Sequence, residues 1–221
     1  EPLVPPPPPP ADAGAVQRLV ERIRAELGDS CLVALPQTGE GSAPRVVLVS
    51  DRDRSMMQYA AAVLPDPQAP EAPPFGQRAV LVDPRQCPAV NFLRARAEYP
   101  AFGLSLGLVS PEVMSGGRLI GSIEGVSPGA YTALLLVDDN GVVQDLRRFI
   151  RFSGGKAEFD VPVSRDGDPR DTSQILIALA APSRPSTITN LAGRLAEDFF
   201  PALAKDLPAN ASLAVLPFDL R

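Results

Sequence analysis

The stretch ALLLVDDNGVVQDL, residues 133–146, decides the fold of the larger part of the chain. Five apolar residues lead into a polar centre, and a second apolar run follows it. Asn140-Gly141 supplies the positive φ angles that a type I′ turn needs. The stretch therefore predicts a tight antiparallel hairpin.

Short apolar segments separated by turn residues continue on both sides of this hairpin. The further predicted strands are 104–109, 118–124, 150–152, 157–163, 174–180 and 211–216. Residues 192–207 return to helical spacing and predict one late helix. Strands at such regular spacing favour an antiparallel β-sandwich over residues 101–221, with 174–180 as a central strand.

The first hundred residues follow a different pattern, in which helices alternate with strands. Their predicted order is helix 12–27, strands 31–35 and 45–50, helix 55–64, strand 78–83 and helix 87–97. Asp12 is the expected N-cap of the first helix. The pattern predicts a small αββαβα domain over residues 12–100, so the fold class is α+β with two domains.

A proline tract, Pro5 to Pro10, precedes the first predicted helix. Proline fixes φ and favours an extended polyproline II form, so residues 1–11 are expected to be a semi-rigid linker. The chain also lacks an initiating Met. Together these features predict that it belongs to a longer protein and is held away from an upstream part.

Composition excludes several classes of function. The sequence has no histidine, which removes Ser-His-Asp and Cys-His catalysis and every His-ligated metal site. Its net charge is −5 and it has no basic stripe, so it is not expected to bind nucleic acid. No apolar run is long enough to span a bilayer, so membrane attachment would need an upstream anchor.

Glycine-rich and lysine-containing motifs give no enzyme signature. Ser153-Gly154-Gly155-Lys156 lacks the spacing of a phosphate-binding loop and lies between two predicted strands, as expected of a hairpin. A Ser–Lys pair using Lys156 or Lys205 lacks a nearby helix-borne serine motif.

Two groups of carboxylates are candidates for metal binding or acid–base chemistry. They are Asp166, Asp168 and Asp171 in one predicted loop, and Asp138, Asp139 and Asp145 around the hairpin. The first group has no calcium-loop register, and turn chemistry with solubility explains the second better than acid–base catalysis. We therefore expect no catalytic residue, no metal and no cofactor.

Cys31 and Cys87 are the only cysteines. Two buried thiols and one disulfide both fit this count, and a disulfide would place the chain outside the cytosol. Cys31 begins one predicted strand and Cys87 follows another. A bridge is therefore feasible if those strands are neighbours.

Three stretches carry a resemblance to known proteins: residues 86–93, QCPAVNFL, residues 119–143 and residues 174–182. The first resembles the C-terminal extracytoplasmic region of membrane-anchored bacterial serine/threonine kinases, in which an earlier cysteine also stands at a strand start. The other two are similar to a β-rich domain of unknown function. The order of elements in residues 12–100 also resembles small BON-type domains of the bacterial envelope.

The resemblance implies a periplasmic, non-catalytic sensing or interaction module of a receptor-type kinase, with a structural Cys31–Cys87 bridge. Kinase signatures are absent, so an enzyme is not expected. The implied partner is a protein or small ligand of the envelope, and self-association into a homodimer stays open. The alternative is a structural subunit of a secretion or cell-envelope complex.

Overall fold

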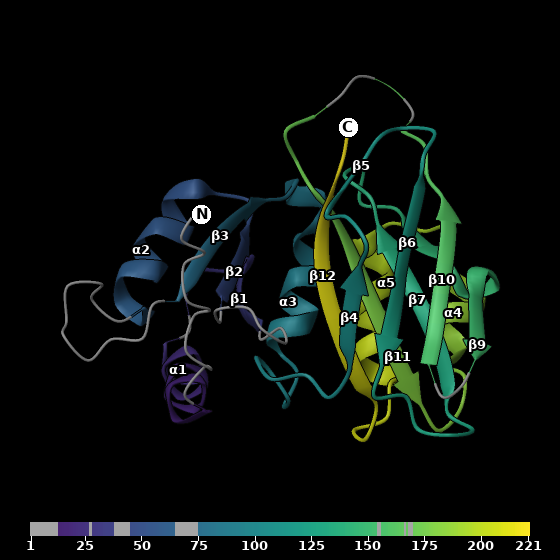
Figure 1. The fold of residues 1–221 in the computed structure, drawn as a ribbon, viewed down its shortest axis with the longest axis horizontal. Coiled ribbons are helices and arrows are strands. Elements are labelled where there is room, and N and C mark those ends of the chain that lie inside the picture. The colour runs from purple at the N-terminus through teal and green to yellow at the C-terminus, as the bar shows by residue number, and fades with distance from the viewer. Residues whose placement is uncertain are drawn as a thin grey trace, which may run out of the picture.

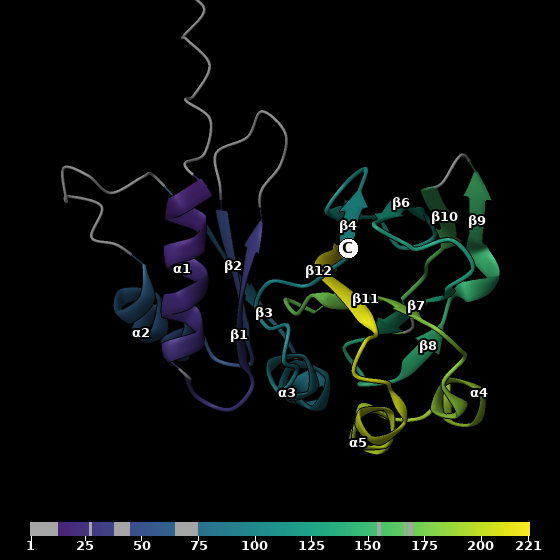
Figure 2. The same ribbon diagram turned by 90° about the horizontal axis from the view of Figure 1, so that it is seen from below.

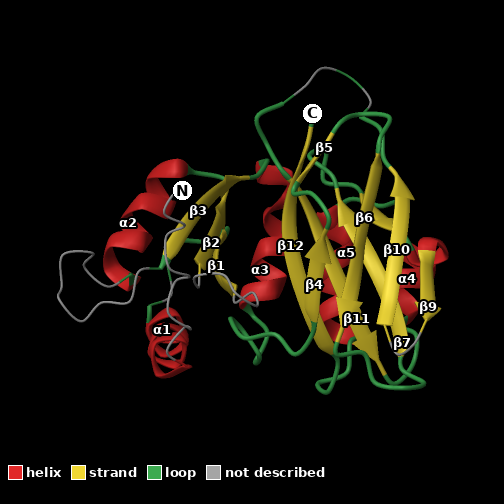
Figure 3. Cartoon of the chain, viewed as in Figure 1, coloured by secondary structure: helices red, strands yellow, loops and turns green. Residues whose placement is uncertain are grey.

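The protein was analysed as a computed structural model, which describes residues 13–26, 28–37, 45–64, 75–153, 156–165, 167 and 170–221. It is an α+β protein with three mostly antiparallel sheets, as predicted (Figures 1 and 3). The expected linker 1–11 and the expected cap Asp12 lie outside the described residues.

The N-terminal part has the predicted order αββαβα. Its elements are α1 (Ala13–Ala25), β1 (Leu32–Gln37), β2 (Arg45–Ser50), α2 (Asp53–Val63), β3 (Gly76–Leu81), the 3-10 turn η1 (Pro84–Gln86) and α3 (Cys87–Arg94). The sheet order is β1-β2-β3, with β1 antiparallel and β3 parallel to β2. Helices α1 and α2 cover one face and α3 lies on the other (Figure 2).

The C-terminal part is a sandwich of a four-stranded sheet, β4-β6-β10-β9, and a five-stranded sheet, β5-β12-β11-β7-β8. Its strands are β4 (Ser105–Leu108), β5 (Glu112–Val113), β6 (Arg118–Glu124), β7 (Tyr131–Val137), β8 (Val143–Asp145), β9 (Ile150–Ser153), β10 (Lys156–Pro162), β11 (Gln174–Ala181) and β12 (Ser212–Leu220). A 3-10 turn, η2 (Arg147–Phe149), links β8 to β9. All pairings are antiparallel except the short parallel contact of β5 with β12.

The central strand β11 explains why the sequence there is apolar without alternation. All of its residues are buried. Leu176 and Ala178 face the core between the two sheets, whereas Ile175 and Ile177 face the helices on the other side. A strand that is covered on both faces has a continuous hydrophobic run in its sequence.

Two helices, rather than the predicted one, cover the outer face of the five-stranded sheet (Figure 2). They are α4 (Ser186–Leu191) and α5 (Ala196–Asp206). The start of α4 is held by Asp206, whose carboxylate accepts the Thr187 N–H at 2.7 Å. This cap comes from another helix, so the local sequence did not reveal α4.

The predicted antiparallel pairing of β7 with β8 is confirmed, but the type I′ turn expected at Asn140-Gly141 is wrong. Gly141 has φ +79°, but Asn140 does not have a positive φ. The Gly141 N–H donates to the Asp138 carbonyl at 2.8 Å, and the Asp138 N–H donates to the Val142 carbonyl at 3.1 Å. The connection is thus a longer loop with a single left-handed glycine.

A single hydrophobic core crosses the boundary predicted near residue 100. It includes α3 residues, the outer face of the five-stranded sheet and α5. Phe92 of α3 and Phe200 of α5 pack with ring centroids 5.2 Å apart. Both rings are almost fully buried, so apolar burial stabilises the seam between the two parts.

Candidate functional site

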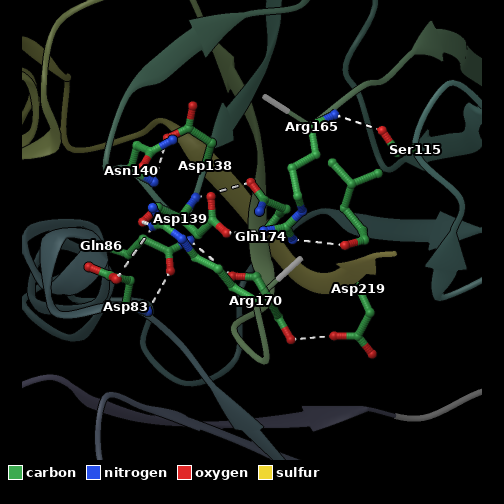
Figure 4. Close-up of polar contacts among 12 residues, drawn as sticks. Asp83, Gln86, Ser115, Asp138, Asp139, Asn140, Arg165, Arg170, Gln174 and Asp219 are labelled. Carbon is green, nitrogen blue, oxygen red and sulfur yellow. Dashed lines mark hydrogen bonds and ion pairs between the residues drawn. The ribbon is translucent and has the colours of Figure 1, made fainter. Parts of the chain in front are cut away.

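The seam between the two parts also carries a polar cluster, centred on the turn that leads into α3 (Figure 4). Gln86 is fully buried, and its side-chain amide donates to the carbonyls of Val137 at 3.0 Å and Ser173 at 3.1 Å. Its side-chain oxygen accepts the Asp83 N–H at 2.8 Å. One side chain therefore ties η1 to the ends of both β7 and β11.

The β7–β8 loop fits against the same turn. The Asp138 carboxylate accepts the N–H groups of Asn140 and Val142, both at 2.9 Å, and so shapes the loop from within. A Cβ atom on Gly141 would lie 2.9 Å from both the Cβ and the carbonyl oxygen of Arg85. Glycine is required at 141 by this close approach and by its positive φ.

A buried ion pair lies beneath the loop. The Asp139 carboxylate and the Arg165 guanidinium are 2.5 Å apart, and each side chain is only 6% exposed. Arg165 also donates to the Leu220 carbonyl at 2.8 Å, and the Asp139 N–H donates to the Gln174 side chain at 3.2 Å. The pair thus joins the loop, the β10–β11 connection and the end of β12.

This burial corrects the expectation that turn chemistry and solubility account for Asp139. Asp138 does shape its turn, but Asp139 is removed from water and engaged by a cation. A carboxylate held in this way is a structural anchor, because its charge is already compensated by Arg165.

At the surface of the cluster, Asp83 caps η1. Its carboxylate accepts the Arg85 N–H at 3.0 Å and forms an ion pair with the Arg85 side chain at 2.8 Å. Hydrogen bonding by Arg85 holds the pKa of Asp83 below its ordinary value. Asp83 is therefore charged at neutral pH and contributes to the seam in that form.

An open cleft of about 700 Å³ lies between the two parts. Its N-terminal wall is made by Val16 and Val20 of α1, by the end of β1 at residues 35–37 and by Arg45. Segment 100–107, Glu124, Gly125 and residues 214–216 of β12 make the opposite wall.

A backbone hydrogen bond fixes the start of β4 to β12 beside this cleft. The Leu104 N–H donates to the Leu213 carbonyl at 3.0 Å and ties the start of β4 to β12. Leu106 and Val215 line the cleft as half-buried residues that also pack against the hydrophobic cores, while Arg45 and Glu124 carry its charges. Such a lining suits binding of an apolar group flanked by polar contacts.

Cys31 and Cys87 form a disulfide, as predicted. It joins the start of β1 to the start of α3, and the Cys31 N–H donates to the Asn91 side chain at 2.9 Å. The sulfurs and an Asp51 oxygen lie within 4.8 Å of one another. Because the sulfurs are bonded to each other, they do not present the thiolates that a metal would bind.

The other residues considered from the sequence do not converge on one site. Asp166 and Asp168, like Gly154 and Gly155, lie outside the described residues. Asp171 lines a separate polar slot beside β3. Lys156 pairs with Glu124 on the four-stranded sheet at 3.0 Å, and Lys205 is exposed on α5.

Sequence reasoning missed Gln86, Arg165 and Gln174. Two of them carried a usable signal, since Gln86 and Gln174 are amides placed at the edges of apolar runs. Arg165 carried none, because its partner is 26 residues away and both are surrounded in sequence by other charges.

Comparison with known proteins gives no relative. No family model, curated protein or solved structure matches the chain. In the part of the chain that the structure describes, no helix has the length and apolar character needed to cross a membrane.

Proposed function

We propose that this chain is a non-catalytic, extracytoplasmic sensing and interaction module of a bacterial receptor-type serine/threonine kinase. Its ligand would bind in the cleft between the two parts. The observation that carries the proposal is that both parts supply walls of this cleft. A ligand seated there contacts α1 on one side and the sandwich on the other.

The position of α1 gives a route for a signal. Val16 and Val20 line the cleft, and α1 is the first described element of the chain. The opposite wall is anchored by the sandwich core and by the polar seam. A ligand that changes the packing of α1 therefore acts on the residues that lead upstream.

The disulfide supports an extracytoplasmic location, because such bonds persist in oxidising compartments. Its position also supports a sensing role, since it fixes β1 to α3 beside the seam. Ligand binding would then move α1 against a rigid base.

The test uses the full-length protein in its native membrane, with phosphorylation of the kinase domain as readout. We expect Val16→Arg, which places a charge at the α1 wall of the cleft, to change the phosphorylation level. Val109→Arg is the matched control, because Val109 is 79% exposed and lies outside the cleft lining. Wild-type phosphorylation in both variants would contradict the proposal, and so would the absence of a kinase upstream.

A further inference from the structure

The two edges of the three-stranded sheet differ in their backbone groups. In β1, the backbone N–H and carbonyl positions of Ala34 and Pro36 point away from β2, as the pairing register requires. The Ala34 N–H donates to the Tyr99 hydroxyl at 2.8 Å, and Pro36 has no N–H to offer. The β1 edge is therefore closed to an additional strand.

The opposite edge, β3, has no neighbouring strand among the described residues. The Val82 N–H donates to the Ser50 carbonyl, so the alternate residues Val80 and Arg78 turn their backbone groups toward β2. Gln77 and Ala79 consequently turn theirs outward. Both residues are exposed, and no hydrogen bond from the described residues reaches these outward groups.

A narrow polar slot of about 270 Å³ runs along this open edge. Residues 78–81 form one side, and residues 170–173 form another. The Ser173 N–H donates to the Leu81 carbonyl at 2.9 Å, which closes one end of the edge. The buried hydroxyl of Thr172 lines the slot without a hydrogen-bond partner in the described structure.

The charged residues that line the slot determine whether it favours a positively or a negatively charged ligand. The three arginines that line the slot each have an acidic partner: Arg78 pairs with Asp219 at 3.3 Å, Arg170 with Asp83 at 3.9 Å and Arg221 with Glu112 at 3.5 Å. Asp53 and Asp171 are exposed and have no ion pair with any described residue. The uncompensated charge lining the slot is therefore negative, which suits a cationic side chain.

We propose that the β3 edge binds an extended, basic segment of a partner polypeptide by strand addition. The segment pairs with the outward backbone groups of Gln77 and Ala79, and its lysine or arginine side chain enters the slot beside Asp53 and Asp171. This surface shares no lining residue with the cleft between the two parts, so it goes beyond the proposed function.

The test selects a random dodecapeptide library, displayed on phage, against the disulfide-intact protein. We expect enriched peptides to carry a β-prone segment with lysine or arginine. Their affinity should fall about tenfold or more in Ala79→Pro, which removes one outward donor and no bond to β2. Gln77→Ala keeps the backbone and is the matched control, with wild-type affinity expected.

A second variant does not depend on the backbone. Asp53→Asn combined with Asp171→Asn should weaken the same peptides several-fold and reduce the salt dependence of their binding. The proposal is overturned if no basic peptide is enriched, or if enriched peptides bind both variants as tightly as wild type. Sedimentation velocity that shows a wild-type dimer and a monomeric Ala79→Pro variant would assign the edge to a second copy, and would overturn it too.

Discussion

Removal of the Cys31–Cys87 disulfide should strongly destabilise the folded protein. The two cysteines are separated by 56 residues in the sequence. The chain-entropy relation for a loop of this size gives about 4 kcal/mol at 25 °C. We therefore expect Cys31→Ala with Cys87→Ala to lower the free energy of unfolding by about that amount.

The backbone at Cys31 makes the prediction more specific. Cys31 has φ +61°, a left-handed conformation that costs a residue with a side chain about 1 kcal/mol or more. Glycine adopts it without this cost. Cys31→Gly with Cys87→Ala should thus be about 1 kcal/mol more stable than the double alanine variant, although both lack the disulfide.

Urea unfolding followed by far-ultraviolet circular dichroism measures both differences. Reduced wild-type protein is the control for the chemical change. In denaturant without reductant, an alkylating reagent should label neither cysteine of the native protein. A loss below about 1 kcal/mol in the alanine variant, or equal stability of the two variants, would refute the reasoning.

Three further predictions concern the polar seam. Arg165→Met leaves the buried Asp139 charge unpaired and should lower the free energy of unfolding, measured in urea, by about 3–5 kcal/mol. Adding Asp139→Asn should recover part of this loss. A loss under about 1 kcal/mol would show that the pair is not buried in solution. Gly141→Ala should lower the free energy of unfolding by about 2 kcal/mol or more, because the new Cβ atom would meet Arg85 and the backbone there has a positive φ. An unchanged urea midpoint would contradict the close approach. The pKa of Asp83 is lowered in the folded state. The Asp83 carboxylate therefore stabilises the fold at pH values above its ordinary pKa near 3.8, and this stabilisation is lost as the pH falls through the lower folded pKa. In Asp83→Asn, the free energy of unfolding should therefore fall less steeply as the pH is lowered below about 4 than in wild type. The same steepness in both proteins would contradict a role for the Asp83 charge.

Elements with a strong local pattern were predictable from the sequence. The run of seven apolar residues in β11 identified a central strand, and alternation identified β6 with the bounds that the structure shows. The amphipathic spacing of α1 and the apolar run of β2 likewise placed the N-terminal order correctly. In each of these, the burial of the side chains follows the periodicity of the segment itself.

Elements that depend on distant partners were not predictable. The two-residue strand β5 exists because it pairs with Asp219 and Leu220, which lie about a hundred residues later in the sequence. Helix α4 begins where Asp206 accepts the Ser186 hydroxyl and the Thr187 N–H. Local propensity contains neither partner, so these elements appear only once the chain is folded.

The same limit applies to the candidate sites. The count of two cysteines fitted both a disulfide and two buried thiols, and the structure shows the disulfide. The cleft, by contrast, combines Val16 with Leu106 and Val215, which no spacing rule connects. The open edge of β3 required the register of β2 and β3, which decides where the groups of Ala79 point.

The coding sequence upstream of Glu1 tests the proposed function most directly. A receptor-kinase module predicts a serine/threonine kinase domain followed by about 20 consecutive apolar residues that can span the membrane. The proline tract would then connect that span to α1. A bare signal peptide, or an unrelated secretion domain directly before the tract, would contradict the kinase assignment and favour a structural subunit of the cell envelope.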